Sequence, residues 1–305
     1  SVGVCGSDVH YYEHGRIGDM VVTAPLVLGH EVSGVVAAVG EDVEESRVGQ
    51  RVAIEPQRPC RRCRHCQRGE LNLCPHMEFY ATPPIDGAFC DYVVAPADMA
   101  HPVPDTLSDH AAALLEPFSV GLWACRKARI EPGSRVFVTG AGPIGALACL
   151  AARSYGASEV VVTDLVESRR KRILDFGASA AVDPADPAFD PTSLGADAFI
   201  ECSGATPAMR SGLEALRGGG TAVMVGLGDE EMSLPVQHIA TREITLTGIF
   251  RYVDTWPKAI GAAGQFDVGL DDLVTAEYPL EEVEAALTSD ADPQSMKSVV
   301  VVSQG

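Results

Sequence analysis

The pattern of hydrophobic and polar positions divides the chain into three blocks. In residues 1 to about 118, short β-branched runs alternate with Gly, Pro and Cys, and long helical periodicities are few. Three of these runs, at 35–39, 51–54 and 92–94, are bounded by turn residues and predict strands. The first block therefore predicts an irregular, mostly β domain.

The second block, from about 119 to 250, alternates strand-like and helix-like stretches. We expect strands at 136–139, 159–163, 198–200 and 221–225, and helices at about 143–155, 167–176 and 206–217. This alternation predicts an α/β domain in which helices cover a parallel sheet. The last block, from about 252, contains helical stretches and a predicted strand at 298–302, and periodicity does not show which domain it joins.

Length and composition indicate a globular protein. A chain of 305 residues favours two domains, and a hydrophobic content of 46% supplies ample core. No apolar run approaches the length of a membrane span, so we expect no membrane partner. The first five residues lack the basic and apolar pattern of a signal peptide, so we expect a cytoplasmic protein.

The charge balance argues against one class of partner. The chain has 42 acidic and 23 basic residues, a net charge of −19, and only four lysines. Such a surface repels phosphate backbones, so nucleic-acid binding is not expected. The acidity is compatible with simple solubility or with a cytoplasm at high salt, and the sequence leaves both readings open.

A glycine-rich motif lies between the first strand of the second block and the helix that follows it. Glycines at G-x-G-x-x-G spacing permit a tight turn and close approach of the backbone to a pyrophosphate at the helix N-terminus. The motif predicts a dinucleotide site whose residues are Gly140, Gly142, Pro143, Ile144 and Gly145.

The next strand supports this prediction. Asp164 ends that strand, nineteen residues after Gly145. A carboxylate there can accept hydrogen bonds from the adenosine ribose and would repel a 2′-phosphate, which favours NAD over NADP. Arg169 is expected near the adenosine end of the cofactor. Arg169 and Arg170 are positive charges that could give the protein some residual affinity for NADP.

Four of the nine cysteines lie close together in the chain, at Cys60, Cys63, Cys66 and Cys74. Four thiolates with no open position predict a structural zinc site. The alternatives are an iron–sulfur site and a set of reduced thiols. Since the chain shows no sign of secretion, metal ligation is favoured over disulfides.

A second set of metal-ligating residue types is dispersed along the chain: Cys5, His30, Glu31 and Glu116. Each alone has an ordinary structural explanation, such as a small core residue or a carboxylate at a helix end. Together, a thiolate, an imidazole and a carboxylate suit a catalytic zinc with one position left for water or substrate.

The segment 29–43 reads G-H-E-x2-G-x5-G-x2-V, and it resembles the signature of the zinc-containing alcohol dehydrogenases. The resemblance to this medium-chain dehydrogenase family runs through the whole chain. It is strongest to the polyol branch, the sorbitol and xylitol dehydrogenases, through residues 5–11, 14–18, 81–87, 116–121 and 250–257.

The resemblance implies a two-domain fold. A GroES-like catalytic domain would comprise residues 1–118 and a C-terminal return at 252–305, and a Rossmann NAD-binding domain would comprise 119–251, with the active site in the cleft. Family members begin a few dozen residues before Cys5, so we expect a sheet edge left unpaired by a missing leading strand. The family also implies a homo-oligomer, either a dimer or a tetramer.

The resemblance also assigns roles to residues. Cys5, His30 and Glu31 match the catalytic zinc ligands, and Glu116 matches a residue that either binds zinc or holds its water and the substrate. Ser7 and His10 match a proton relay toward solvent. Positions around the polyol pocket are matched by Tyr11, Phe79, Thr82, Glu116, Arg251 and Tyr252. Further positions along the cofactor are matched by Val225, Gly226, Ile249, Phe250 and Arg251.

The implied reaction is zinc-dependent transfer of a hydride from a polyol to NAD, giving the ketose. A dehydrogenase of L-threonine or of a simple secondary alcohol shares the zinc signatures and remains the alternative. Two readings without catalysis, an NAD-binding regulatory or structural protein and a zinc-module DNA binder, are disfavoured by the complete ligand set and by the net charge, respectively.

Overall fold

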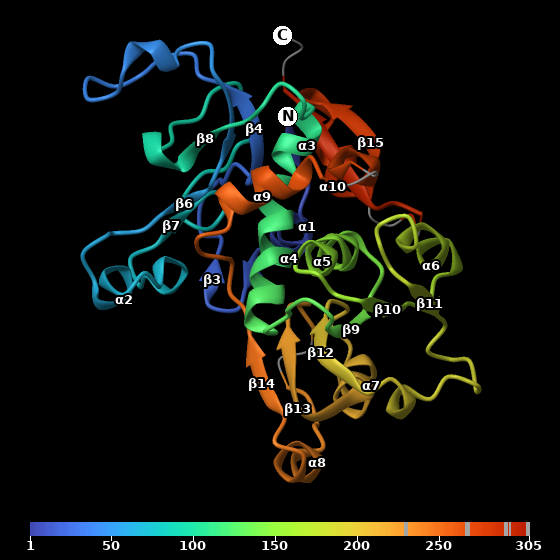
Figure 1. The fold of residues 1–305 in the computed structure, drawn as a ribbon. Coiled ribbons are helices and arrows are strands. Elements are labelled where there is room, and N and C mark those ends of the chain that lie inside the picture. Colours follow the sequence, from blue (N-terminus) through green and yellow to red (C-terminus); the bar gives the residue numbers. More distant parts are fainter. Residues whose placement is uncertain (229–230, 266–268, 290–291, 293, 303–305) are drawn as a thin grey trace. The chain divides into compact units, whose positions relative to one another are not determined.

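The structure is a computed structural model that describes residues 1–228, 231–265, 269–289, 292 and 294–302 (Figure 1). The chain forms two compact units, one made of Ser1–Glu116 with Val253–Gly305, the other of Pro117–Tyr252. The last block of the sequence therefore joins the first. Among the described residues, no helix is both long enough and apolar enough to cross a membrane.

The second unit contains a six-stranded parallel sheet. Its strands, in chain order, are β9 (Arg135–Thr139), β10 (Glu159–Thr163), β11 (Ala180–Val182), β12 (Ala196–Glu201), β13 (Leu216–Met224) and β14 (Thr245–Gly248). Their spatial order is β11-β10-β9-β12-β13-β14, and every pair is parallel. The strand order reverses between β9 and β12, which is where doubly wound folds bind their ligands. The predicted α/β class is confirmed.

Helix α4 (Leu115–Lys127) precedes β9, and four helices connect strands of the sheet: α5 (Pro143–Ser154), α6 (Glu167–Ile173), α7 (Thr206–Ala215) and α8 (Val236–Thr241). The core beneath α7 centres on Phe137 and Phe199, whose rings stack with centroids 5.6 Å apart. A Cβ at Gly212 would lie 2.0 Å from the Phe199 ring, so this glycine lets α7 lie directly on the sheet.

The first unit contains a mixed six-stranded sheet in the order β15-β16-β1-β4-β5-β8. The strands are β1 (Val2–Gly3), β4 (Glu31–Val35), β5 (Arg51–Ile54), β8 (Ala100–Pro102), β15 (Val274–Pro279) and β16 (Lys297–Val301). The pair β15–β16 is parallel and the other pairs are antiparallel. β1 is paired on both sides, so the edges of this sheet are β8 and β15.

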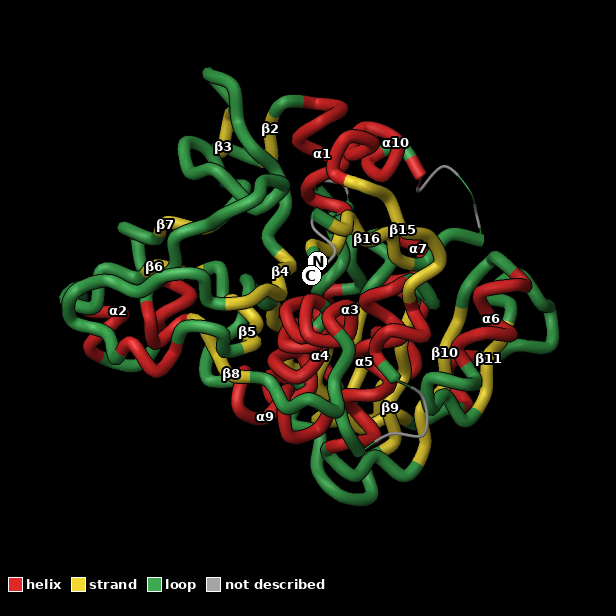
Figure 2. The backbone as a smooth tube through the Cα atoms, turned by 90° about the horizontal axis from the view of Figure 1, so that it is seen from above, coloured by secondary structure: helices red, strands yellow, loops and turns green. Residues whose placement is uncertain are grey.

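Short elements surround this sheet. Two hairpins pair β2 (Arg16–Ile17) with β3 (Met20–Val21) and β6 (Gln57–Arg58) with β7 (Glu78–Phe79). Figure 2 shows that loops dominate the excursion between β6 and β7, which carries α2 (Arg64–Gln67). The other helices are α1 (Gly6–His14), α3 (Asp109–Ala113), α9 (Trp256–Ala263) and α10 (Val283–Leu287). The 3-10 turns of this unit are η1 (Glu45–Arg47), η2 (Leu71–Leu73), η3 (Ala97–Met99), η5 (Leu270–Leu273) and η6 (Leu280–Glu282), while η4 (Pro191–Ser193) lies in the second unit.

Two strand predictions are wrong. The run 35–39 is not a strand, because β4 ends at Val35, whose side chain is 62% exposed. The run 92–94 forms no strand either, and Tyr92 and Val94 are each at least 80% exposed. Both runs have the residue types of strands, but they lack the side-chain burial that stabilises a paired strand. The predicted helix at 167–176 is also shorter, since α6 ends at Ile173.

Candidate active site and metal centres

Three predicted zinc ligands converge in the first unit. Cys5 is the residue immediately before α1, while His30 and Glu31 lie at the start of β4. Their ligand atoms, one from each residue, all lie within 4.8 Å of one another. His30 and Glu31 are buried, and Cys5 is half-buried. A thiolate, an imidazole and a carboxylate at this spacing can hold one divalent cation.

Asp8, to which the sequence motifs assigned no role, orients these ligands. Its buried carboxylate accepts hydrogen bonds from the backbone N–H of Cys5 (3.0 Å) and of Gly29 (2.9 Å). One of its oxygens also lies 3.3 Å from Nδ1 of His30. The pairing occupies Nδ1 and leaves Nε2 for a metal, an arrangement of carboxylate and histidine that recurs at zinc sites. In the sequence, only the position of Asp8 one helical turn after Cys5 indicates that it supports the ligands.

In the Asp8–His30 pair, charges and hydrogen bonds shift both pKa values against the effect of burial. Burial alone lowers the pKa of His30, but the charges of Asp8 and Cys5 and hydrogen bonds to both raise that pKa well above its usual value. Burial alone raises the pKa of Asp8, but His30 and the two N–H donors lower it below its usual value. The charge balance of the group therefore favours a cation beside His30, and a metal ion would replace the proton there.

The Glu31 carboxylate is fully buried, and its two oxygens have different surroundings. Oε1 accepts a hydrogen bond from Nζ of Lys297 at 2.5 Å. Oε2 has no hydrogen-bond partner among the described residues. Because an unpartnered buried carboxylate oxygen is costly, a cation beside Cys5 and His30 would satisfy it. The residues of this group therefore fit a bound metal.

Glu116 is buried and lies outside this three-residue group. Burial lowers the pKa of Lys297, but the charges of Glu31, Cys5 and, least of all, Glu116 raise it above its usual value. Ser7, His10 and Tyr11 all lie on α1, which begins directly after Cys5. Tyr11 is buried, Ser7 is half-buried and His10 is exposed. The helix therefore reaches from the metal group to the surface of the unit.

Phe79 and Thr82 form a turn beside the group. The Phe79 ring is tilted against the His30 ring, with centroids 5.6 Å apart, and its carbonyl accepts the N–H of Thr82. Between them, Ala81 is buried with a φ of 54°, in the left-handed region that non-glycine residues rarely adopt. Such strain is concentrated at functional sites, which agrees with the position of this turn next to His30.

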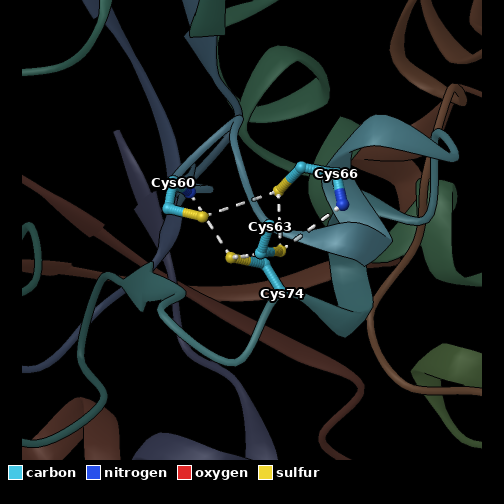
Figure 3. A group of neighbouring side chains, drawn as sticks. All are labelled: Cys60, Cys63, Cys66 and Cys74. Atoms are coloured by element: carbon cyan, nitrogen blue, oxygen red, sulfur yellow. Dashed lines mark hydrogen bonds between the residues drawn. The ribbon is translucent and has the colours of Figure 1, made fainter.

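The four clustered cysteines form the second metal group, as Figure 3 shows. Their sulfur atoms lie 3.5 Å (Cys63–Cys66), 3.9 Å (Cys63–Cys74) and 4.0 Å (Cys60–Cys66) apart. A tetrahedral ion with metal–sulfur bonds of about 2.3 Å separates its sulfurs by about 3.8 Å. The spacing therefore fits a single zinc ion, and a multi-iron cluster would need the sulfurs farther apart.

The surrounding backbone supports this assignment. The N–H of Arg62 is the main cause that lowers the pKa of Cys60 to about 6, so one thiolate forms near neutral pH. The N–H groups of Cys60 and Cys66 point at the sulfurs of Cys74 and Cys63, at 3.4 and 3.5 Å. Such donors stabilise the negative charge of a thiolate set.

Replacing Cys63 with serine is expected to remove about one zinc per chain, because it breaks a site that needs four thiolates. Metal analysis of the purified protein measures this loss. Cys90→Ser is the matched control, because Cys90 is also half-buried but belongs to neither group. Equal zinc content in the two variants would contradict the assignment of the cluster.

The glycine-rich turn lies at the switch point of the second unit's sheet. Gly140 directly follows β9 with a φ of 89°, and a Cβ on it would lie 3.1 Å from the backbone of Cys202, which follows β12. A Cβ on Gly145 would lie 1.9 Å from the Gly140 carbonyl oxygen. Gly142 is the N-cap of α5, with Pro143 as the first helical residue, and a Cβ on Gly142 would meet nothing within 4 Å. The space beside Gly142 at the N-terminus of α5 therefore leaves room for an anion to approach the backbone.

Two carboxylates organise this turn. Asp164 accepts the N–H groups of Ala141 and Val166, both at 2.7 Å, so it already contacts the turn after β9. Glu201, which the sequence motifs did not single out, is 2% exposed at the end of β12. Its carboxylate accepts hydrogen bonds from Thr139, Ser203 and Gly204, which fixes the two loops at the switch point.

The remaining predicted cofactor positions follow β13 and β14. The N–H groups of Val225 and Gly226 both bond to the Glu201 carbonyl at 2.9 Å, which places them beside the same switch point. Ile249 donates to the Met224 carbonyl. The Arg251 guanidinium lies over the exposed Phe250 ring, 4.6 Å from its centroid, and Tyr252 is fully buried. Arg169 is half-buried on α6.

The chain matches two protein families. Residues 1–105 match the alcohol dehydrogenase GroES-like domain, and residues 143–264 match the zinc-binding dehydrogenase family. The chain is 44% identical to a sorbitol dehydrogenase from Mus musculus over 95% of its own length and 84% of that protein. It is 41% identical to a probable D-xylulose reductase A from Aspergillus clavatus, over 98% of this chain and 86% of that one.

The fold has a solved counterpart. The crystal structure of an L-idonate 5-dehydrogenase from Escherichia coli superposes with a TM-score of 0.93 at 33% identity, covering 99% of this chain and 89% of that one.

Proposed function

Since this chain belongs to the zinc-binding alcohol dehydrogenase family, we propose that it transfers a hydride from a secondary hydroxyl of a polyol to NAD, giving the ketose. The observation that carries this proposal is the convergence of Cys5, His30 and Glu31 on one cation site. In a chain that also carries a glycine-rich dinucleotide turn, such a site supports redox chemistry on an alcohol.

We propose that the first unit is the catalytic domain and the second the NAD-binding domain. The first holds both metal groups, and the second holds the glycine-rich turn and Asp164. Structural zinc at the four-cysteine group would stabilise the loop between β6 and β7 and take no part in the chemistry, because four thiolates leave no open position.

The residues around the catalytic metal group would each have a role in the reaction. A zinc ion held by Cys5, His30 and Glu31 would act as a Lewis acid and lower the pKa of the substrate hydroxyl. Asp8 holds the His30 ring in the tautomer that presents Nε2. Ser7 accepts the hydroxyl proton as it releases its own proton toward His10, which is exposed one turn away on α1 and passes a proton to solvent. Glu116 holds a polar group of the substrate or a water.

Preference for NAD is proposed from Asp164. Its carboxylate stands beside the glycine-rich turn, where the adenosine ribose of a dinucleotide binds in this fold. A negative charge there accepts hydrogen bonds from ribose hydroxyls and repels a 2′-phosphate. Nearby Arg170 forms an ion pair with Asp183, with 3.2 Å between nitrogen and oxygen, and this pairing competes with binding of a 2′-phosphate by that arginine.

A polyol is favoured over a simple alcohol for two reasons. The relatives described above include proteins named for sorbitol and D-xylulose. The chain also carries polar side chains at the positions matched to the pocket, including Thr82 in the turn beside His30 and Arg251. A site that hydrogen-bonds substrate hydroxyls discriminates strongly against substrates that leave those groups unpaired.

A substrate panel tests this proposal. We expect kcat/KM for NAD reduction to be at least about 100-fold higher with xylitol or sorbitol than with ethanol. L-threonine and 2-propanol complete the panel, and NADP replaces NAD in a parallel series at low and molar salt. Equal efficiency on ethanol and xylitol would refute the polyol assignment, and a preference for L-threonine would replace it with an amino-alcohol substrate.

We further propose a cytoplasmic homo-oligomer, a dimer or a tetramer, acting on small molecules rather than on nucleic acid. The net charge of −19 supports the exclusion of nucleic acid. Light scattering of the purified protein tests the oligomeric state, and a monomer at micromolar concentration would contradict it.

A further inference from the structure

The Glu31 carboxylate lies in a cradle built by the first and last strands of the sheet. β1 lies between β16 and β4, and Gly3 is the residue of β1 that pairs with both Glu31 and Val299. Residues paired across antiparallel strands carry their side chains on the same face of the sheet. The Glu31 side chain therefore extends over the position where Gly3 has no side chain.

The space at Gly3 is filled by that carboxylate. A Cβ built on Gly3 would lie 2.0 Å from Glu31 Oε2 and 3.1 Å from the Glu31 Cδ. Real Cβ atoms do not approach an oxygen so closely, so any side chain at position 3 must displace the carboxylate. Gly3 does not have a positive φ, so backbone conformation does not require glycine here. The three atoms nearest to such a Cβ all belong to Glu31, so the requirement comes from that side chain.

Lys297, the first residue of β16, holds the other side of the carboxylate. Its side chain is buried, and its Nζ donates to Glu31 Oε1 at 2.5 Å and to the Val4 carbonyl at 2.8 Å. Val4 directly precedes Cys5, so one ammonium group links the strand that carries Glu31 to the segment that carries the thiolate. A buried lysine is costly unless it is paired, and both of these bonds pair it.

Together these contacts select one oxygen for the metal. Lys297 engages Oε1, while Oε2 passes over Gly3 and is left without a hydrogen-bond partner among the described residues. We propose that Gly3 and Lys297 are positioning residues that hold the Glu31 carboxylate so that Oε2 faces the cation site shared with Cys5 and His30. This inference rests on the proposed metal site, and it makes the strands at the two ends of the chain part of that site.

Zinc retention by the full-length protein tests the proposal, with a chromophoric chelator as competitor. Gly3→Ala is expected to weaken zinc binding at the catalytic site at least about tenfold, the usual cost of losing an outer-shell partner. Gly34→Ala is the matched control, because Gly34 lies on the same strand as Glu31 and a Cβ there meets nothing within 4 Å. The four-cysteine zinc should stay bound in both variants.

Lys297→Met is expected to weaken zinc binding to a similar degree. Lys297→Arg keeps a charged donor and is expected to retain most of the wild-type zinc affinity. If Lys297 acts through Glu31, replacing Lys297 should matter little once Glu31 is changed. In a Glu31→Gln background, Lys297→Met should therefore lower zinc affinity by less than about a further twofold. The cobalt-substituted protein gives a second readout, since its visible spectrum reports the ligands around the ion and should change in Lys297→Met but not in Lys297→Arg.

The outcomes separate this inference from the metal site on which it rests. If Glu31→Gln keeps wild-type zinc affinity, the assignment of Glu31 as a ligand fails, and the inference fails with it. If Glu31→Gln loses affinity but Gly3→Ala behaves like Gly34→Ala, or Lys297→Met binds zinc as the wild type does, only the positioning role is overturned. Thermal unfolding of each variant with both sites loaded shows whether the fold persists.

Discussion

Cys5→Ala is expected to lower kcat/KM for polyol oxidation by at least about 1,000-fold. Metal-ion catalysis stabilises the transition state by several kcal/mol, and each 1.36 kcal/mol corresponds to about a tenfold change in rate. Cys5 contributes the only thiolate of the catalytic group. Without it, a histidine and one carboxylate remain, and zinc binding there should fail. Metal analysis together with the rate of NADH formation measures both effects.

The control for this variant is Cys90→Ala, since Cys90 lies in the same unit but in neither metal group. The four-cysteine zinc should remain in Cys5→Ala, so that the metal content falls by about one ion per chain. Activity within a few fold of the wild type in Cys5→Ala would show that the reaction does not depend on this site.

Gly142→Ala is expected to weaken NAD binding at least about tenfold, or about 1.4 kcal/mol, while leaving the fold intact. A Cβ on Gly142 meets no protein atom within 4 Å, and its φ of −75° is open to alanine. The added methyl group would instead occupy the space through which the backbone approaches a pyrophosphate. Fluorescence titration with NADH measures the affinity.

Gly145→Ala provides the contrast. Its Cβ would lie 1.9 Å from the Gly140 carbonyl oxygen, so the turn or α5 must shift. Overpacking of this kind costs about 1–3 kcal/mol of stability, which should appear as a lower melting temperature together with weaker NAD binding. A Gly142→Ala protein that binds NADH as tightly as the wild type would place the dinucleotide elsewhere.

Local sequence patterns predicted much of the second unit. The strand, glycine-rich turn and helix around Gly140 follow one another without interruption, and buried β-branched runs such as 159–163 occur only where the sheet is covered on both faces. The spacing of the four cysteines was equally informative, because ligands of one ion within a short loop must lie close in the chain.

The first unit was harder to predict. Residues such as Val35, Tyr92 and Val94 have the residue types of strands, but the structure exposes them, and exposure depends on neighbours that a local pattern does not contain. The supporting residues of the metal site could not be predicted either, because their roles also depend on contacts with residues far away in the sequence. Lys297 meets Glu31 across 266 positions of the chain, so no window of sequence reports their contact. Gly3 is one small residue among many, and its role follows only from the strand register.

The most direct test of the central claim is a zinc titration of chelator-treated full-length protein, with NADH formation from xylitol or sorbitol as the readout. The site formed by Cys5, His30 and Glu31 predicts that protein holding only the four-cysteine zinc is inactive, and that activity rises in proportion to added zinc until about one further ion per chain is bound. Full activity before that second ion binds, or no activity after both sites are filled, would contradict zinc-dependent polyol oxidation by this chain.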